Sequence, residues 1–228
     1  MSAIDAFTPL RPDLDPYKLG HVHDVAGLHV HDASGHGAGG PASKRVIVGY
    51  GFWIFLLSDI ILFSAFFAAY AVLWTETAGG PSGRDLFDPG SVAIETACLL
   101  LSSFTCGMSA VATGARSQLW TQVFLVATGL LGAAFLAFEA KDFAGMVAQG
   151  AGPQRSAFLS SFFAVVGCHG IHVTTGMLWL GTMMAQVWVK GFRPNILRRL
   201  LCFNLFWHVL DIIWIALFTI VYLIGEGR

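Results

Sequence analysis

The sequence predicts an all-α polytopic membrane protein, a bundle of five transmembrane helices. The chain is 55% hydrophobic and only 12% charged, which is typical of proteins embedded in a bilayer. It also contains five apolar segments, each with the roughly 20 residues that a helix needs to cross about 30 Å of hydrocarbon. Gly- and Pro-rich stretches separate several of these segments and suit loops. The predicted spans are residues 46–74, 91–114, 119–140, 156–189 and 199–225.

Residues 1–45 form a predicted His-rich tail, and residues 46–228 form the transmembrane domain. The tail has several Asp and Pro residues and no apolar core, so we do not expect a signal peptide. A His-Val-His-Asp tetrapeptide occurs twice, and the tail's metal-ligand candidates are His21, His23, His29, His31 and His36. Such a tract can chelate Zn²⁺, Cu²⁺ or Ni²⁺. The alternative is a solvated tail whose histidines have no specific role.

Basic residues concentrate on the loops that share a side with the N-terminus. That side carries Lys44, Arg45, Arg116, Lys190, Arg193, Arg198 and Arg199, whereas the opposite side carries Arg84, Lys141, Arg155 and Arg228. Since short cytoplasmic loops are enriched in Lys and Arg, we expect a cytoplasmic N-terminus and a C-terminus on the outer side.

Local signals mark several helix ends. Ser91 and Ser156 suit the N-cap position of the second and fourth spans, because their hydroxyls can accept from backbone N–H groups of the first turn. The third span contains small residues, among them Gly129 and Gly132, that permit close approach of another helix.

Seven ionisable residues lie inside the predicted spans: Asp59, Glu95, Glu139, His169, His172, His208 and Asp211. At 1.5 Å of rise per residue, Asp59, His169, His208 and Asp211 fall near the middle of the bilayer, on three different spans. Because an ionisable group there costs about 2.5–3.5 kcal/mol on insertion scales, we expect these side chains to face the bundle interior and to have partners.

Two pairs are spaced to share a helix face. His169 and His172 are one turn apart, as are His208 and Asp211, and the latter two can form a hydrogen bond. Glu95 and Glu139 lie nearer the outer ends of their spans, where we expect water or Lys141 to satisfy them.

Three interpretations of these residues compete. Haem or copper ligation needs more membrane histidines than the chain contains. A proton path or transporter would use intramembrane acids and histidines, but no inverted repeat or matched pair of broken helices is visible. The third is a polar brace, defined here as interhelical polar contacts that fix helix register and help to hold a partner subunit or lipid. Residue chemistry favours the brace, with no catalytic residue in this chain.

Three motifs then resemble a known family. They are Gly51-Phe52-Trp53-Ile54 with Leu57-Ser58-Asp59-Ile60-Ile61-Leu62-Phe63, then Gly167-Cys168-His169-Gly170-Ile171-His172-Val173, and Phe206-Trp207-His208-Val209-Leu210-Asp211-Ile212-Ile213-Trp214. In order and spacing they resemble subunit III of the haem-copper respiratory oxidases. The five-span form, the loop at residues 77–85 and the segment at 152–156 look most like the bacterial cytochrome o ubiquinol oxidases.

The resemblance implies a non-catalytic subunit of a bacterial inner-membrane, proton-pumping ubiquinol oxidase, with a periplasmic C-terminus. Haem and copper would reside in partner subunit I, where O₂ is reduced to water, and subunits II and IV would be further partners. This chain would carry no cofactor except bound phospholipid, and would support assembly and stability. The family's carbodiimide-reactive carboxylate falls on Asp59. The alternatives are subunit III of a cytochrome c oxidase and a stand-alone proton-coupled carrier.

Overall fold

The computed structural model describes residues 44–86 and 88–223, and within them every regular element is helical, as predicted. Five helices are long and apolar enough to cross a membrane. The elements are α1 (Lys44–Leu73), α2 (Gly83–Leu86), α3 (Pro89–Gly114), α4 (Gln118–Ala148), α5 (Ala157–Lys190), α6 (Pro194–Leu217) and the π-helical turn η1 (Phe218–Leu223). The chain divides into two units, Met1–Ile47 and Val48–Arg228, and the second contains the helical bundle. The five tail histidines lie outside the described residues.

Most span boundaries agree with the sequence prediction within a few residues, but two do not. The third span was predicted to end at residue 140, and α4 continues to Ala148. The polar residues Lys141 and Asp142 suggested an end, yet Met146 beyond them is buried in the core, which keeps this stretch helical. The fifth span was predicted from residue 199, but α6 begins at Pro194, a residue suited to the first turn because it has no N–H to satisfy.

One of the two predicted N-caps is correct. Ser156 caps α5 by accepting from the backbone N–H of Leu159 at 3.2 Å. Ser91 does not cap α3, because Asp88 takes that position and accepts from Gly90 N at 3.0 Å, followed by Pro89 in the first turn. The Ser91 hydroxyl instead donates to Asp142 Oδ2 of α4 at 2.8 Å.

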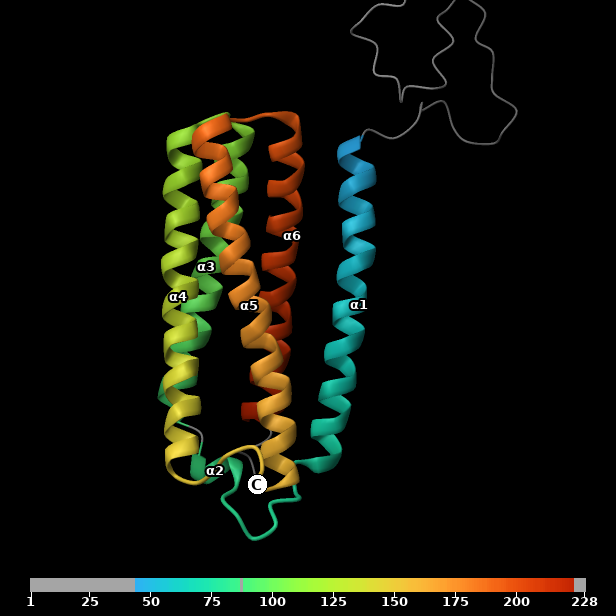
Figure 1. Ribbon diagram of the computed structural model, residues 1–228, viewed down its shortest axis with the longest axis vertical. Helices are drawn as coiled ribbons and strands as arrows, with labels where there is room; N and C mark the ends of the chain where they lie inside the picture. The colour runs from blue at the N-terminus through green and yellow to red at the C-terminus, as the bar shows by residue number, and fades with distance from the viewer. Residues whose placement is uncertain (1–43, 87, 224–228) are drawn as a thin grey trace, which may run out of the picture. The chain divides into compact units, whose positions relative to one another are not determined.

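The helices α3, α4, α5 and α6 form a four-helix arrangement in which each packs against two others. The contacting pairs are α3 with α4, α4 with α5, α5 with α6, and α6 with α3. Figure 1 shows these four helices side by side, alternating in direction along the chain. The α4 helix turns into the following loop at Gly150, whose φ of 77° suits glycine and lets Ala151 N donate to Met146 O at 2.9 Å.

Trp207 joins all four helices at the centre of this arrangement. It projects from α6 and is 1% exposed. A Cβ atom added at Gly132 of α4 would lie 3.1 Å from its ring, and one at Gly176 of α5 would lie 2.9 Å from it. The indole N–H donates to Ser102 Oγ of α3 at 3.0 Å. The predicted close approach at Gly132 is therefore confirmed, and a large aromatic ring is what fills it.

The α1 helix is attached differently, through large side chains rather than close backbone packing. In the apolar 18-residue stretch of α1, only 11% of the residues are buried inside the protein. In the corresponding stretch of the span Pro194–Leu223, 56% are buried. Phe52 meets Trp179 of α5 edge to face at 5.8 Å, and the Tyr70 hydroxyl donates to Val221 O at 3.1 Å. Much of the apolar surface of α1 is thus left for lipid or another protein.

Candidate functional site

The structure distributes the seven predicted ionisable residues over separate neighbourhoods. Asp59 and His172 lie between α1 and α5, His169 lies in an aromatic enclosure, His208 and Asp211 face α3, and Glu95 and Glu139 lie between α3 and α4. Among residues 44–86 and 88–223 no hydrogen bond joins one neighbourhood to the next. Asp59, His169, His208 and Asp211, which the sequence places at a similar depth, therefore do not form one hydrogen-bonded group in the described structure.

The seam between α3 and α6 is the part of the structure that behaves as a polar brace. Four side-chain hydrogen bonds cross it in antiparallel register. They are Thr96 with Trp214 at 3.1 Å, Ser102 with Trp207 at 3.0 Å, Ser103 with His208 at 2.8 Å, and Cys106 with Asn204 at 3.2 Å. Interhelical hydrogen bonds in membranes contribute about 0.6 kcal/mol on average. Four in series oppose sliding of one helix along the other, because any slip breaks all of them.

His208 and Asp211 share this seam but do not bond directly to each other, contrary to the sequence prediction. Ser103 lies between them: its hydroxyl is 2.8 Å from His208 Nδ1 and is also a side-chain partner of Asp211. The Asp211 Oδ1 atom is buried without a hydrogen-bond partner. The His208 ring packs over Gly107 of α3. A Cβ atom added at Gly107 would lie 3.9 Å from ring atoms Cε1 and Nε2, so the ring fits against α3 without a clash.

We expect His208→Ala to lower the stability of the bundle. The change removes the bond between the imidazole and the Ser103 hydroxyl, which keeps Asp211 as a partner, at a cost of about 0.5–1.5 kcal/mol. Unfolding of the detergent-solubilised protein by heat or SDS measures this. His172→Ala is the control, because the ring of His172 has its hydrogen-bond partners on its own helix, Cys168 O at 2.8 Å and Cys168 Sγ at 3.7 Å. Equal stability of the two variants would mean that the seam does not hold the helices.

His169 is enclosed by aromatic rings. It is 0% exposed, and its ring lies 6.3 Å from Phe63, 5.8 Å from Phe135 and 5.3 Å from Trp214. Neither ring nitrogen has a hydrogen-bond partner. These contacts come from α1, α4 and α6, so the imidazole fills a junction of four helices. Phe63 also touches His172 at 5.3 Å, which confirms that the two histidines share one face of α5.

Asp59 lies half-buried on α1, close enough to Cys168 of α5 for an electrostatic interaction. The described residues contain no group of three or more His, Cys, Asp or Glu side chains that could hold a metal ion. The contacts of these side chains can hold helices in position, but among the described residues they form no set of metal ligands.

Glu95 and Glu139 correct the sequence prediction most clearly. Both were expected at the membrane edge with water or Lys141 as partner. They are instead 1% and 5% exposed, and Glu95 Oε1 and both carboxylate oxygens of Glu139 lack hydrogen-bond partners. The reason is the longer α4, which places Glu139 well inside the helix and against Gly170 of α5, where a Cβ would lie 2.9 Å from Glu139 Oε1.

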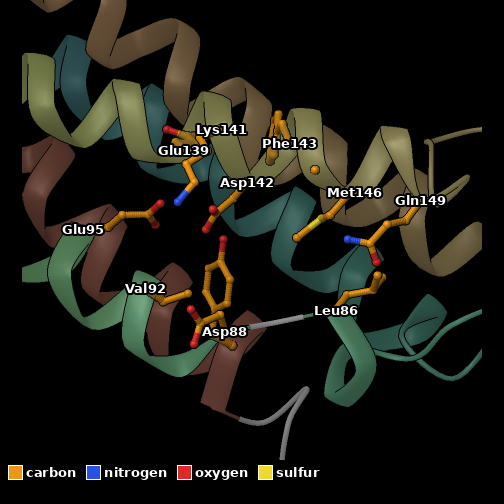
Figure 2. Close-up of a pocket in the computed structure, with 12 residues that line it drawn as sticks. Leu86, Asp88, Val92, Glu95, Glu139, Lys141, Asp142, Phe143, Met146 and Gln149 are labelled. Carbon is orange, nitrogen blue, oxygen red and sulfur yellow. The ribbon is translucent and has the colours of Figure 1, made fainter.

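These two acids line a cavity of about 180 Å³, which we call the acidic cavity. Its lining includes Asp88, Val92, Glu95, Glu139, Lys141 and Asp142. Figure 2 shows the side chains of Glu95 and Asp142 reaching into the same space from α3 and α4.

Sequence reasoning missed the α3 half of the seam. Thr96, Ser102, Ser103 and Cys106 of α3, and Asn204 opposite them on α6, were not singled out as polar contacts, because neutral polar residues are common in membrane helices. The signal was nevertheless present: small polar residues recur on α3 at intervals of three and four residues from Ser102 to Ser109. That spacing marks one face of a helix, and small polar faces favour helix association in membranes.

Comparison with known families agrees with this picture. The family model described as cytochrome c oxidase subunit III matches residues 28–226, which is nearly the whole chain. The chain belongs to this family. The resemblance drawn from the three motifs is confirmed, and one of those motifs, from Phe206 to Trp214, supplies most of the α6 half of the seam.

Several similar proteins are quinol oxidase subunits. This subunit III is 46% identical over 213 residues to the cytochrome bo(3) ubiquinol oxidase subunit 3 of Pseudomonas aeruginosa, covering 92% of this chain and 94% of the relative. It is 49% identical over 175 residues to that of Pseudomonas putida, covering 77% and 84%. It is 42% identical over 177 residues to the quinol oxidase subunit 3 of Bacillus subtilis, covering 78% and 87%. Subunit III is thus a multi-pass membrane protein of a multi-subunit oxidase.

Proposed function

We propose that this chain is the non-catalytic subunit III of a ubiquinol oxidase in the aerobic respiratory chain. The observation that carries the proposal is the 46% identity over 92% of the chain to a ubiquinol oxidase subunit 3. Its task is to brace and stabilise the complex, whose O₂ reduction and proton pumping belong to other chains. In support, the described residues join helices through polar and aromatic contacts.

The proposal includes the surroundings of the chain. Subunit I holds the haem and copper, and subunits II and IV complete the complex. The complex lies in the bacterial inner membrane with the N-terminus of this chain in the cytoplasm and its C-terminus in the periplasm. The exposed apolar surface of α1 supports contact with a neighbour in the bilayer, since a membrane helix with so little burial in its own chain has surface left to share.

Bound phospholipid is a further part of the proposal. A cavity of about 350 Å³ lies between α1, α5 and α6, lined by Val48, Phe52, Trp179, Arg198 and Arg199 among others. Arg199 Nη1 donates to Gln186 Oε1 at 3.0 Å, and Arg198 donates to Asn195 Oδ1. Two guanidinium groups beside aromatic rings suit a phosphate with acyl chains attached.

Co-purification tests the proposal. The full chain, tagged and expressed in its own host, is extracted in mild detergent, and its partners are identified by mass spectrometry and visible absorption. We expect a haem-bearing subunit I together with other oxidase subunits. A chain that emerges alone would instead be a carrier. Oxidation of ubiquinol rather than reduced cytochrome c by the purified complex separates this function from that of a cytochrome c oxidase.

A further inference from the structure

The acidic cavity lies apart from the polar brace and from the lipid cavity beside α1. It is formed by α3 and α4 near the ends that carry Pro89 and Ala148, with Tyr222 of η1 also in its lining. The Asp142 carboxylate accepts from Ser91 Oγ at 2.8 Å, whereas Glu95 Oε1 and both carboxylate oxygens of Glu139 are buried without a hydrogen-bond partner. The brace does not use these two acids, so their burial needs another explanation.

Three carboxylate oxygen atoms are buried without a hydrogen-bond partner: Glu95 Oε1, Glu139 Oε1 and Glu139 Oε2. A buried polar atom left without a hydrogen bond costs about 1–3 kcal/mol, and more when it belongs to a charged group. A buried carboxylate in a folded protein is therefore paired with donors or with a cation, or it takes up a proton and becomes neutral. The described residues contain no group of three or more His, Cys, Asp or Glu side chains that could hold a metal ion, which favours a cation bound through hydrogen bonds.

A primary ammonium group matches these acceptors. It carries three N–H donors and one positive charge, and its hydrogen bonds do not require the short distances and fixed geometry of metal coordination. The space of about 180 Å³ exceeds what one or two waters need, and a two-carbon amine fits within it. Asp88 and Asp142 add negative charge around the same space.

Lys141 is the rival occupant within the chain. It lines the cavity, but its side chain is exposed and it forms no ion pair with Glu95 or Glu139 in the described structure. Figure 2 shows the Lys141 nitrogen turned toward Glu95 and Asp142, with Gln149 at the other end of the cavity. Both side chains can donate hydrogen bonds to a phosphate attached to the amine.

We propose that the acidic cavity binds a primary ammonium group through Glu95 and Glu139, supplied by the headgroup of an ethanolamine lipid or by a free amine of that size. An ethanolamine phospholipid has both features in one molecule. Its ammonium group would bind Glu95 and Glu139, and its phosphate would accept from Lys141 and Gln149.

Native mass spectrometry of the intact complex tests the proposal. Delipidated complex is exposed to ethanolamine or choline phospholipids with identical acyl chains, in a buffer free of primary amines. Choline is the comparison because its quaternary nitrogen has no N–H to donate. Since a hydrogen bond to a charged group contributes about 1.5–3 kcal/mol, we expect at least a tenfold preference for ethanolamine lipid.

Variants and a second measurement make the result decisive. Glu95→Gln combined with Glu139→Gln should abolish the preference, and Asp59→Asn, an acid on α1 outside the cavity, should retain it. Free ethanolamine should raise the thermal midpoint of the wild-type complex, and tetramethylammonium should not. This measurement remains informative if the double variant fails to assemble.

The outcomes separate the two sources. Lipid preference without an effect of free ethanolamine identifies the lipid headgroup, and the reverse identifies a free amine. Equal retention of both lipids with no stabilisation by ethanolamine would overturn the proposal. So would a carbodiimide cross-link that joins Lys141 to Glu95 or Glu139, because the chain's own amine would then occupy the cavity.

Discussion

Trp207→Ala is expected to destabilise this subunit by about 3 kcal/mol. Replacing a buried Trp by Ala in soluble proteins costs about 3–5 kcal/mol through lost contacts and the cavity left behind. In a bilayer the separated helices remain in an apolar medium, so the hydrophobic part of that cost is smaller and the lower end applies. Trp207 contacts α4 and α5 at Gly132 and Gly176 and donates to Ser102 of α3, so its loss loosens four helices together.

Reversible unfolding in SDS and detergent mixtures measures this effect. Trp188→Ala is the matched control, because Trp188 lies on α5 and is 74% exposed. Trp207→Phe should fall between wild type and Trp207→Ala, since it keeps part of the ring and loses the bond to Ser102. A change of less than 0.5 kcal/mol on Trp207→Ala, about the effect of an ordinary surface substitution, would show that the bundle does not depend on this residue.

Gly176→Val is expected to have the next largest effect, in this case through overpacking. Even a single Cβ at Gly176 would lie 2.9 Å from Trp207 Cζ3 and 3.0 Å from Phe206 Cε1, and valine adds two methyl groups beyond it. Because both rings belong to the packed core, α5 and α6 must move apart. Overpacking of this kind costs about 1–3 kcal/mol.

The same helix offers the control for this change. A Cβ at Gly181 would meet nothing within 4 Å, so Gly181→Val tests the effect of valine on the helix without the clash. We expect a lower yield of assembled complex and a lower unfolding midpoint for Gly176→Val alone. Equal behaviour of the two variants would mean that close approach of α5 and α6 is not required.

The spans could be predicted from sequence because a bilayer imposes one dominant requirement, a long apolar helix. Boundaries failed where the chain departs from that rule. Lys141 and Asp142 look like the end of a span, but α4 continues past them around the acidic cavity. Arg198 and Arg199 look like a loop, but the helix that carries them already begins at Pro194.

The candidate site was predictable only in part. The spacing of His169 and His172 fixed their shared face, because that follows from helix geometry alone. Counting residues along each span gave similar depths for Asp59, His169 and His208, but depth does not say which way a helix is turned. Rotation depends on which residues pack between helices, and here Trp207, Gly176 and the small polar residues of α3 determine it.

The claim that this chain braces an oxidase without carrying its redox centres is tested most directly by one spectrum. The chain is separated from its co-purified partners in detergent, and its visible absorption is measured beside theirs. We predict a Soret band in the partner fraction and none in the fraction of this chain. A Soret band in stoichiometric amount on the isolated chain would contradict the account and make it a haem protein in its own right.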